Sequence, residues 1–287
     1  MIGRGRDYFL AGAAMIAVSL GVYAARRDAY VACRPGLVKR GARCCVTVSD
    51  HGSCASSLRP QSFSRADRIL VVSRSVELRG ESFERSQPST TSVQTASFEL
   101  LRTELRCGDA MLVLGSSASA TTSRLCEGDA ERAAGGLSFP QAERVCRALG
   151  GRLPSEAEWQ RAAGARGTRY PWGETGATCR VAVWGIDGGP CFGGSIEPNG
   201  ANSGGPDTVD SRPAGASVEG VIDLAGNVGE WVTSDGAPVL KGGDYASLDA
   251  AELRVFARRS APRDETLARN GARCAFDLAR PPAGSLP

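Results

Sequence analysis

The chain has 287 residues, of which 34 are Lys or Arg, 31 are Asp or Glu, ten are Cys and one is His. This length suits one large domain or two small ones, and a hydrophobic content of 42% is typical of a globular protein rather than a disordered or fibrous one. A net charge of +3 is too small to indicate nucleic-acid binding, and a single histidine excludes metal centres that need several histidine ligands.

Residues 1–27 are expected to direct the chain out of the cytoplasm. Two arginines precede an apolar run at residues 8–25, which suits a signal-peptide core or a short membrane anchor. Val22-Tyr23-Ala24 resembles a cleavage site, whereas Arg26-Arg27 favours an uncleaved anchor. All ten cysteines follow this run, so we expect an exported protein of the periplasm or cell envelope, either cleaved or attached to the inner membrane.

Residues 28–70 are expected to form a small cysteine-rich segment. Its cysteines lack the two C-x-x-C pairs of a typical zinc site, which favours a disulfide-stapled module. Three pairings are open, and His51 is expected in a solvent-facing turn. These four cysteines are Cys33, Cys44, Cys45 and Cys54.

Short strands are expected next, where apolar and β-branched residues cluster. The sequence predicts them at Ile69–Val72, Val76–Leu78 and Phe98–Leu101. Residues 115–123 are rich in Ser, Ala and Thr, and are expected to form a loop.

Two helices carry clear start signals. Ser138-Phe139-Pro140-Gln141 has the capping-box pattern and predicts a helix that stops at Gly150-Gly151, with Cys146 on its buried face. Ser155-Glu156-Ala157-Glu158 has the same pattern and predicts a helix through Ala163. We interpret its two acids as cap and dipole partners rather than as a catalytic pair.

The chain after Gly164 is rich in turn residues for about 75 positions. Four tryptophans lie in or beside this stretch, and packing of an irregular core is favoured over ligand binding as their role. They are Trp159, Trp172, Trp184 and Trp231.

Several ordered motifs together resemble the formylglycine-generating enzyme (sulfatase-modifying factor) family. They are G-G-R-L-P-S-E-A-E-W at 150–159, Y-P-W-G at 170–173, L-A-G-N-V-G-E-W at 224–231, L-K-G-G at 240–243 and N-G-A-R-C-A at 270–275. The resemblance implies a compact, loop-rich α+β fold related to C-type lectins, with little regular secondary structure and with disulfides. We assign this domain to residues 71–278 and a Pro-rich tail to 279–287.

The resemblance also implies a disulfide between Cys146 and Cys274. A second bridge of the family falls on Ala163 and near Ala257, so it is expected to be missing. Among the other cysteines, Cys179 and Cys191 frame a turn-rich loop and are expected to pair, which leaves Cys107 and Cys126 as the remaining candidates.

Structural calcium is a further implication of the resemblance. The side chains of Asn227 and Glu230 would bind it, with backbone help around Ala225, Gly226 and Val228, and such hard oxygens suit Ca²⁺. The alternative is that Asn227 only stabilises the turn. A second calcium site of the family is doubtful, because residues 180–184 contain no asparagine.

The copper-binding cysteines of the family's enzymes fall on Ser247 and Glu252. No cysteine occurs between Cys191 and Cys274, and Cu(I) selects soft thiolates, so copper chemistry is expected to be absent. One histidine cannot build the histidine-rich iron domain of another branch. Asp244, Asp249 and Glu252 could form an alternative carboxylate site, although a solvated loop is favoured, and Asp244, Ser247 and Glu252 are the cavity candidates.

We therefore prefer an exported, catalytically inert member of the family that binds a protein, peptide or glycan, or serves a structural role. An oxidoreductase or other enzyme with relocated active-site residues is the alternative. In a third hypothesis, the cysteine-rich segment is the functional part and the large domain is its scaffold.

Overall fold

The computed structural model describes residues 38–40, 43–45, 67–82, 89–164, 167–186, 189, 191 and 205–278. The chain divides into two units, Met1–Gln61 and Ser62–Pro287. In the first unit, the described residues form an antiparallel pair of strands, β1 (Val38–Arg40) and β2 (Arg43–Cys45). None of the helices in the described ranges is both long and apolar enough to span a bilayer. The expectations for residues 8–25, Cys33, His51, Cys54 and the tail at 279–287 lie outside the described residues.

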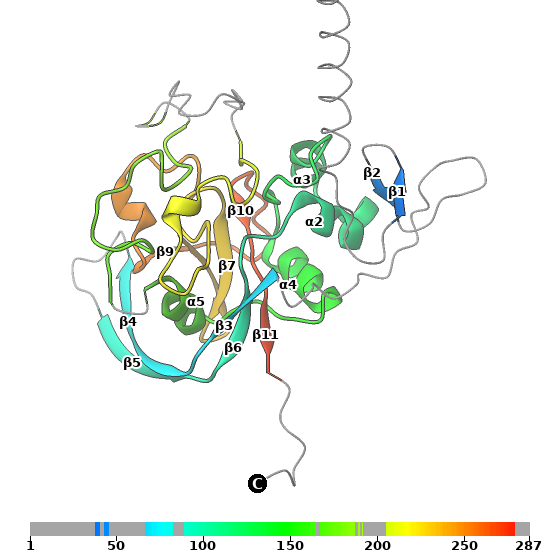
Figure 1. Cartoon of the computed structure of the whole chain (residues 1–287). Helices are drawn as coiled ribbons and strands as arrows, with labels where there is room; N and C mark the ends of the chain where they lie inside the picture. Colours follow the sequence, from blue (N-terminus) through cyan, green and yellow to red (C-terminus); the bar gives the residue numbers. More distant parts are fainter. Residues whose placement is uncertain are drawn as a thin grey trace, which may run out of the picture. The chain divides into compact units, whose positions relative to one another are not determined.

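The second unit contains two sheets (Figure 1). The larger has the strand order β10-β7-β8-β9-β4-β5, in which the pairs β10–β7 and β9–β4 are parallel and the others antiparallel. The smaller has the order β11-β6-β3 and is antiparallel. The strands are β3 (Arg68–Val71), β4 (Arg74–Ser82), β5 (Ser89–Thr95), β6 (Phe98–Leu101), β7 (Gly229–Ser234), β8 (Ala237–Lys241), β9 (Ala257–Ser260), β10 (Asn270–Gly271) and β11 (Ala275–Asp277).

The three predicted strands are present as β3, β4 and β6, and the Ser/Thr-rich residues of β5 add a partner along β4. Because β3 pairs with β6 inside the second unit, the expected domain boundary between residues 70 and 71 falls within a strand of the domain itself. The division of the chain between Gln61 and Ser62 places this strand whole within the second unit.

Both predicted helices form with their capping boxes. In α4 (Phe139–Ala148), the Gln141 N–H donates to Ser138 Oγ, and the Ser138 N–H donates to Gln141 Oε1. The helix ends before Gly150, whose φ of 83° favours glycine. In α5 (Glu156–Ala163), Ser155 and Glu158 make the same reciprocal bonds, and the helix packs against β4, β5 and β7.

The predicted loop at residues 115–123 is wrong. These residues form the short 3-10 helix η2 (Gly115–Ser117) and most of α3 (Ala120–Leu125), which follow α2 (Cys107–Leu114). Ser119 caps α3 by accepting the Thr122 N–H, and the hydroxyls of Ser119 and Thr122 both donate to the carbonyl of Gly136. A Ser/Thr-rich composition therefore marks a capped and anchored short helix here, not an irregular segment.

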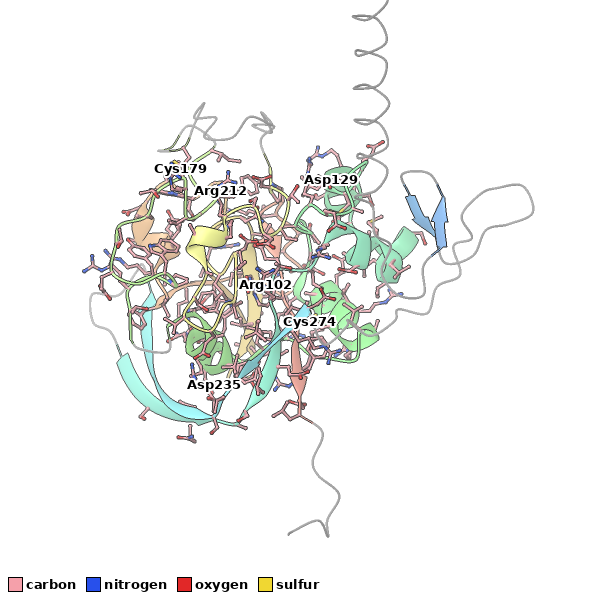
Figure 2. The ribbon with its side chains drawn as sticks, viewed as in Figure 1. Arg102, Asp129, Cys179, Arg212, Asp235 and Cys274 are labelled. Atoms are coloured by element: carbon pink, nitrogen blue, oxygen red, sulfur yellow. A yellow bond between two sulfur atoms is a disulfide. The ribbon has the colours of Figure 1, made fainter. Side chains whose placement is uncertain are left out.

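The three expected disulfides are all formed, and they tie the loops and helices to the core. They are Cys107–Cys126, Cys146–Cys274 and Cys179–Cys191. Beside the last of these, the Arg212 side chain donates from Nε to the Cys179 carbonyl. Figure 2 labels both residues.

Two of the tryptophans pack in the centre of the domain, as expected. Trp231 is fully buried, meets the Phe139 ring edge-on and donates from Nε1 to the carbonyl of Leu137. Trp159 is also fully buried, next to β7 and β8 residues such as Val232. Their size and their hydrogen bonds fix the position of the sheet beneath the loops.

Candidate functional site

The loop that precedes β7 is held by a buried ionic cluster. Arg273 is fully buried, and its Nε donates to both oxygens of Glu230, at 3.0 and 2.8 Å. The Nη2 of Arg273 also donates to Oε1 of Glu230, and Trp159 Nε1 donates to Oε2 at 2.7 Å. Each carboxylate oxygen of Glu230 therefore has N–H donors already in place.

Asn227 is similarly engaged. Its Oδ1 accepts the Asp207 N–H at 2.8 Å, and its Nδ2 donates to Oε2 of Glu104 at 2.7 Å. The backbone turns sharply here, with φ of 80° at Gly226 and 56° at Asn227. At Gly226 a Cβ would meet the Val183 carbonyl oxygen at 2.4 Å, so the turn needs glycine at this position.

The side-chain oxygens assigned to calcium by resemblance thus each accept at least one N–H donor, and a guanidinium contacts Glu230. Calcium needs several oxygens turned towards one point, and the Arg273 guanidinium already places a positive charge against the Glu230 carboxylate. The side chains of Asn227 and Glu230 therefore do not fit a Ca²⁺ ion as they are arranged. Asn227 instead stabilises the turn, through its bonds to Asp207 and Glu104.

Two more carboxyl groups belong to the buried cluster. Glu104 is 1% exposed, and its Oε1 accepts the Val228 N–H. Burial, together with the charges of Asp223 and Glu230, raises the pKa of Glu104 well above its usual value. Burial also raises the pKa of Asp223 to about 6. One arginine therefore faces three carboxyl groups, so negative charge exceeds positive charge in this part of the core at neutral pH.

We expect Asp223→Asn to stabilise the protein at neutral pH and to flatten the dependence of its stability on pH. Because the folded-state pKa of Asp223 is raised, the native protein binds the extra proton, and stability falls as pH rises from about 4 to about 6. The raised pKa of Asp223 corresponds to a free-energy penalty of roughly 3 kcal/mol for the ionised carboxylate in the folded protein. We expect Asp223→Asn to raise the free energy of unfolding at pH 7.5 by roughly 1 to 3 kcal/mol. Denaturant unfolding at several pH values measures it.

Asp235→Asn is the matched control for this substitution. Asp223 and Asp235 both have positive φ values, 58° and 49°, which asparagine tolerates well, but Asp235 is exposed. An equal gain in both variants at every pH would assign the effect to backbone conformation and contradict the role of the buried charge.

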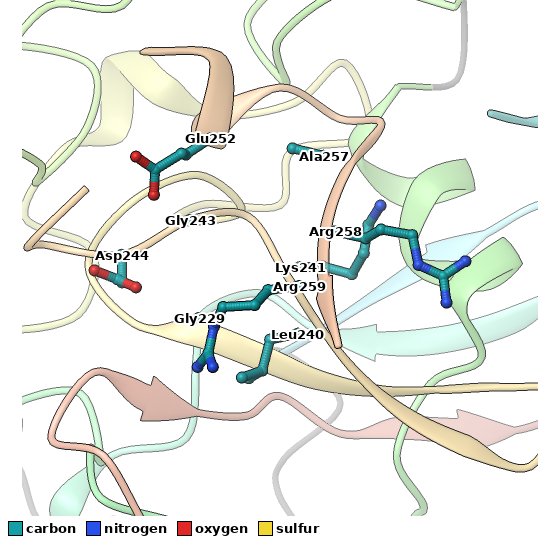
Figure 3. Close-up of a pocket in the computed structure, with 9 residues that line it drawn as sticks. All are labelled: Gly229, Leu240, Lys241, Gly243, Asp244, Glu252, Ala257, Arg258 and Arg259. Atoms are coloured by element: carbon teal, nitrogen blue, oxygen red, sulfur yellow. The ribbon is translucent and has the colours of Figure 1, made fainter. Parts of the chain in front are cut away.

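A pocket of about 300 Å³ is lined by residues of the paired strands β8 and β9, by the segment that follows β8, and by Gly229, the residue before Glu230 (Figure 3). Its walls combine glycines, apolar residues and five charged side chains. They are Gly229, Leu240, Lys241, Gly243, Asp244, Glu252, Ala257, Arg258 and Arg259.

The structure brings the three cavity candidates together. Asp244 and Glu252 line the pocket, and Ser247 links them, because its Oγ accepts the Asp244 N–H at 3.1 Å and donates to Oε2 of Glu252 at 3.0 Å. Asp249 does not line the pocket, since it caps the 3-10 helix η4 (Ala250–Leu253). The favoured interpretation of this segment as a solvated loop is therefore wrong for Asp244, which is buried.

The electrostatics of Asp244 follow from this position. Burial raises the pKa of its carboxyl to about 6, against the opposing effect of Arg269, whose Nε lies 3.6 Å from Oδ2 of Asp244. The charge of Glu252 raises the pKa of Asp244 further. Such a carboxyl can bind a cationic group or hold a proton near neutral pH.

The basic wall of the pocket involves a residue whose role sequence reasoning missed. Glu156 lies in the first turn of α5, yet it is 5% exposed at its side chain and contacts Lys241 at 3.4 Å and Arg258 at 3.1 Å. The cap and dipole role fits Glu158, which completes the capping box and pairs with Arg152. The charged residues of β8 and β9 that form this wall can be seen in the sequence. Their position beside α5 cannot, because it depends on the register of the sheet.

A match to a family model shows to which protein family the chain belongs. The model of the "Sulfatase-modifying factor enzyme 1-like domain" matches residues 60–278. The chain belongs to the sulfatase-modifying factor family. The matched region covers the whole described part of the second unit, including the pocket and the buried Arg273 cluster.

Relatives within the sulfatase-modifying factor family include a formylglycine-generating enzyme from Streptomyces coelicolor, 31% identical over 168 residues, which cover 49% of this chain and 51% of that protein. An "inactive C-alpha-formylglycine-generating enzyme 2" from Bos taurus is 32% identical over 160 residues, which cover 51% and 50% of the two chains. The chain thus spans about half the length of the curated relatives it matches.

Structural comparison agrees with this family fold. The solved structure of variable protein 1 from Treponema denticola superposes with a TM-score of 0.55 and 15% identity, covering 74% of this chain and 95% of that one. At this identity the likeness concerns the fold alone. It shows that the loop-rich α+β scaffold expected from the sequence is present.

Proposed function

We propose that this chain is a binding module of the sulfatase-modifying factor family that does not generate formylglycine with copper. One observation carries the proposal: all six cysteines between residues 67 and 278 are joined in disulfides. Disulfide sulfur is not a thiolate ligand for Cu(I). The two positions that the family resemblance assigns to copper, Ser247 and Glu252, offer a hydroxyl and a carboxylate to the pocket region.

The pocket supports a role in binding. Its volume suits a small molecule or one side chain of a larger partner, such as a protein, a peptide or a glycan. Three disulfides support our proposal that the chain works in an oxidising compartment, exported to the periplasm or cell envelope. Membrane attachment through residues 8–25 belongs to the same proposal.

We also propose that the buried Arg273–Glu230 pair, rather than a calcium ion at Asn227 and Glu230, holds the loop before β7. The hydrogen bonds that Arg273 and Trp159 donate to Glu230 support this view. In this proposal Arg273 supplies the fixed positive charge beside Glu230 that a calcium ion would otherwise supply to the same loop.

The second candidate function is an enzyme of the family with relocated residues. The observation that favours it is the pairing of Asp244 and Glu252 at one pocket, with the pKa of Asp244 raised to about 6. A carboxyl with such a pKa can act as an acid or a base near neutral pH. The binding function remains our conclusion, because the Ser247 hydroxyl beside these acids is engaged by the Asp244 N–H and by Glu252, and the residues that line the pocket include no histidine to activate it.

Copper binding tests the proposed function directly. We expect the purified protein, titrated anaerobically with Cu(I), to show no stoichiometric thiolate-dependent binding. We also expect a C-x-P-x-R peptide incubated with protein, copper and O₂ to gain no formylglycine by mass spectrometry. The double variant S247C/E252C is the matched control, and it should gain Cu(I) binding because it restores two thiols at adjoining positions. Formylglycine produced by the wild-type protein would contradict the proposal.

A further inference from the structure

The pocket has an acidic side. Asp244 and Glu252 both present carboxylates to it, and they lie on the same side of the cavity in Figure 3. Asp244 has Arg269 at 3.6 Å, and the charge of Arg259 also acts on its carboxylate. Glu252 accepts hydrogen bonds from the Ser247 hydroxyl and the Asp249 N–H, and no described cation forms an ion pair with it. Among the described residues, Glu252 is therefore the carboxylate of this pair without an ion-pair partner, and only Asp244 lies beside a cation.

The opposite side of the pocket is basic. Lys241 and Arg258 lie there (Figure 3), and both contact the single carboxylate of Glu156. Arg258 uses Nη1 for this contact and keeps 27% of its side chain exposed, so its guanidinium can still reach a ligand. Arg259 differs, because Glu265 and Asn270 already hold its guanidinium in place. The basic side thus depends on Arg258 for contact with a ligand.

Arg259 lies between the two sides in Figure 3, with its guanidinium bound to Glu265 and Asn270, and the other residues of this part carry no polar side chain. Gly229, Leu240, Gly243 and Ala257 line this part, and Leu240 is buried. A ligand that spans the pocket would therefore meet carboxylates at one end, a mainly apolar middle beside the engaged Arg259, and the guanidinium of Arg258 at the other end. Both ends are partly shielded from water, which strengthens their attraction for opposite charges.

We propose that this pocket binds a small zwitterion, with its ammonium group at Asp244 and Glu252 and its carboxylate at Arg258. This inference rests on the proposed binding function and names the class of ligand for it. An ammonium group would relieve the repulsion between the two carboxylates, and a carboxylate would give Arg258 a partner that it does not share with Lys241. A ligand with one charge can satisfy only one of these ends.

The test uses a series of probes that differ in the distance between their charges. They are glycine, β-alanine, γ-aminobutyrate and δ-aminovalerate, each compared with the alkylamine and the alkanoate of the same chain length. Titrations are followed by saturation-transfer NMR on the full chain. We expect at least one zwitterion to bind about tenfold or more tightly than either of its singly charged analogues, since a hydrogen bond to a charged group adds that much affinity.

Three variants locate the binding. Asp244→Asn and Arg258→Gln should each weaken the best zwitterion about tenfold or more, and Ala257→Phe should fill the pocket and abolish binding without changing its charge. Asp264→Asn is the matched control, because it removes an exposed carboxylate that does not line the pocket, and it should leave the affinity unchanged.

The outcomes separate this inference from the function on which it rests. Absence of binding across the whole series, or equal affinity for a zwitterion and its singly charged analogue, would overturn the zwitterion assignment. If a singly charged probe binds and Ala257→Phe abolishes that binding, the pocket still binds ligands and only the ligand class is wrong. Formylglycine or Cu(I) chemistry in the wild-type protein would instead overturn the proposed function.

Discussion

Replacement of Arg273 with methionine is expected to lower the free energy of unfolding by about 3 to 5 kcal/mol, close to the limit that a small domain can lose and stay folded. Arg273 is fully buried and donates to Glu230, and also to the carbonyls of Leu101, Arg102 and Ile222. Methionine fills part of the volume but donates nothing. The loss removes the guanidinium donor from the buried Ile222 carbonyl and leaves the buried Glu230 carboxylate with the Trp159 N–H but no balancing charge.

Denaturant unfolding monitored by tryptophan fluorescence measures this loss, because Trp159 donates to the same Glu230 carboxylate. Arg273→Lys should also destabilise the protein, since an ammonium cannot reproduce the planar set of donors. The double variant R273M/E230Q should recover part of the stability, because it removes the unpaired charge.

Arg102→Gln is the control for this series. Arg102 forms an ion pair with Asp210 at 3.0 Å, but both side chains are about two-fifths exposed, so its loss should cost less than about 1 kcal/mol. Parallel measurements in calcium and in EDTA test the proposal that no calcium ion supports the loop. A similar cost for Arg102→Gln and R273M, or a large stabilisation by calcium, would contradict the role that we assign to Arg273.

Sequence reasoning succeeded where the determinants are local. The capping boxes at Ser138–Gln141 and Ser155–Glu158 fix helix starts through hydrogen bonds across three residues, and the structure forms those bonds. The strand at Phe98–Leu101 was predicted with the bounds that the structure has, because its apolar run is short and bounded. Helix α3 was missed, since its stability depends on the distant carbonyl of Gly136.

The candidate site shows the same difference between local features, which the sequence reveals, and long-range contacts, which it does not. Asp244, Ser247 and Glu252 lie within nine residues of one another, so their proximity could be foreseen from the sequence. The role of Glu156 could not be foreseen, because its partners Lys241 and Arg258 are far away in the chain and meet it only through the register of β8 and β9. Burial, which raises the pKa of Asp244, is likewise a property of the folded chain and not of its local sequence.

Removal of the Cys146–Cys274 disulfide is expected to cost about 5 kcal/mol, which is more than removal of either of the other two bridges. The reason is the length of chain that each bridge closes in the unfolded state. Cys146 and Cys274 are separated by 128 residues, whereas Cys107 and Cys126 are separated by 19. In the entropic model the shorter loop contributes about 3 kcal/mol.

The double variants C146A/C274A and C179A/C191A give the sharpest comparison, because the separation in the second pair is only 12 residues. Denaturant unfolding of both should show a difference of about 2 kcal/mol in stability, and the m-value should rise more for C146A/C274A, whose unfolded chain expands further. Cys146 and Cys274 are also fully buried, so their replacement by alanine leaves unfilled volume that adds to the cost. Equal losses in the two variants would mean that native packing around each bridge, and not the closed loop, sets its contribution.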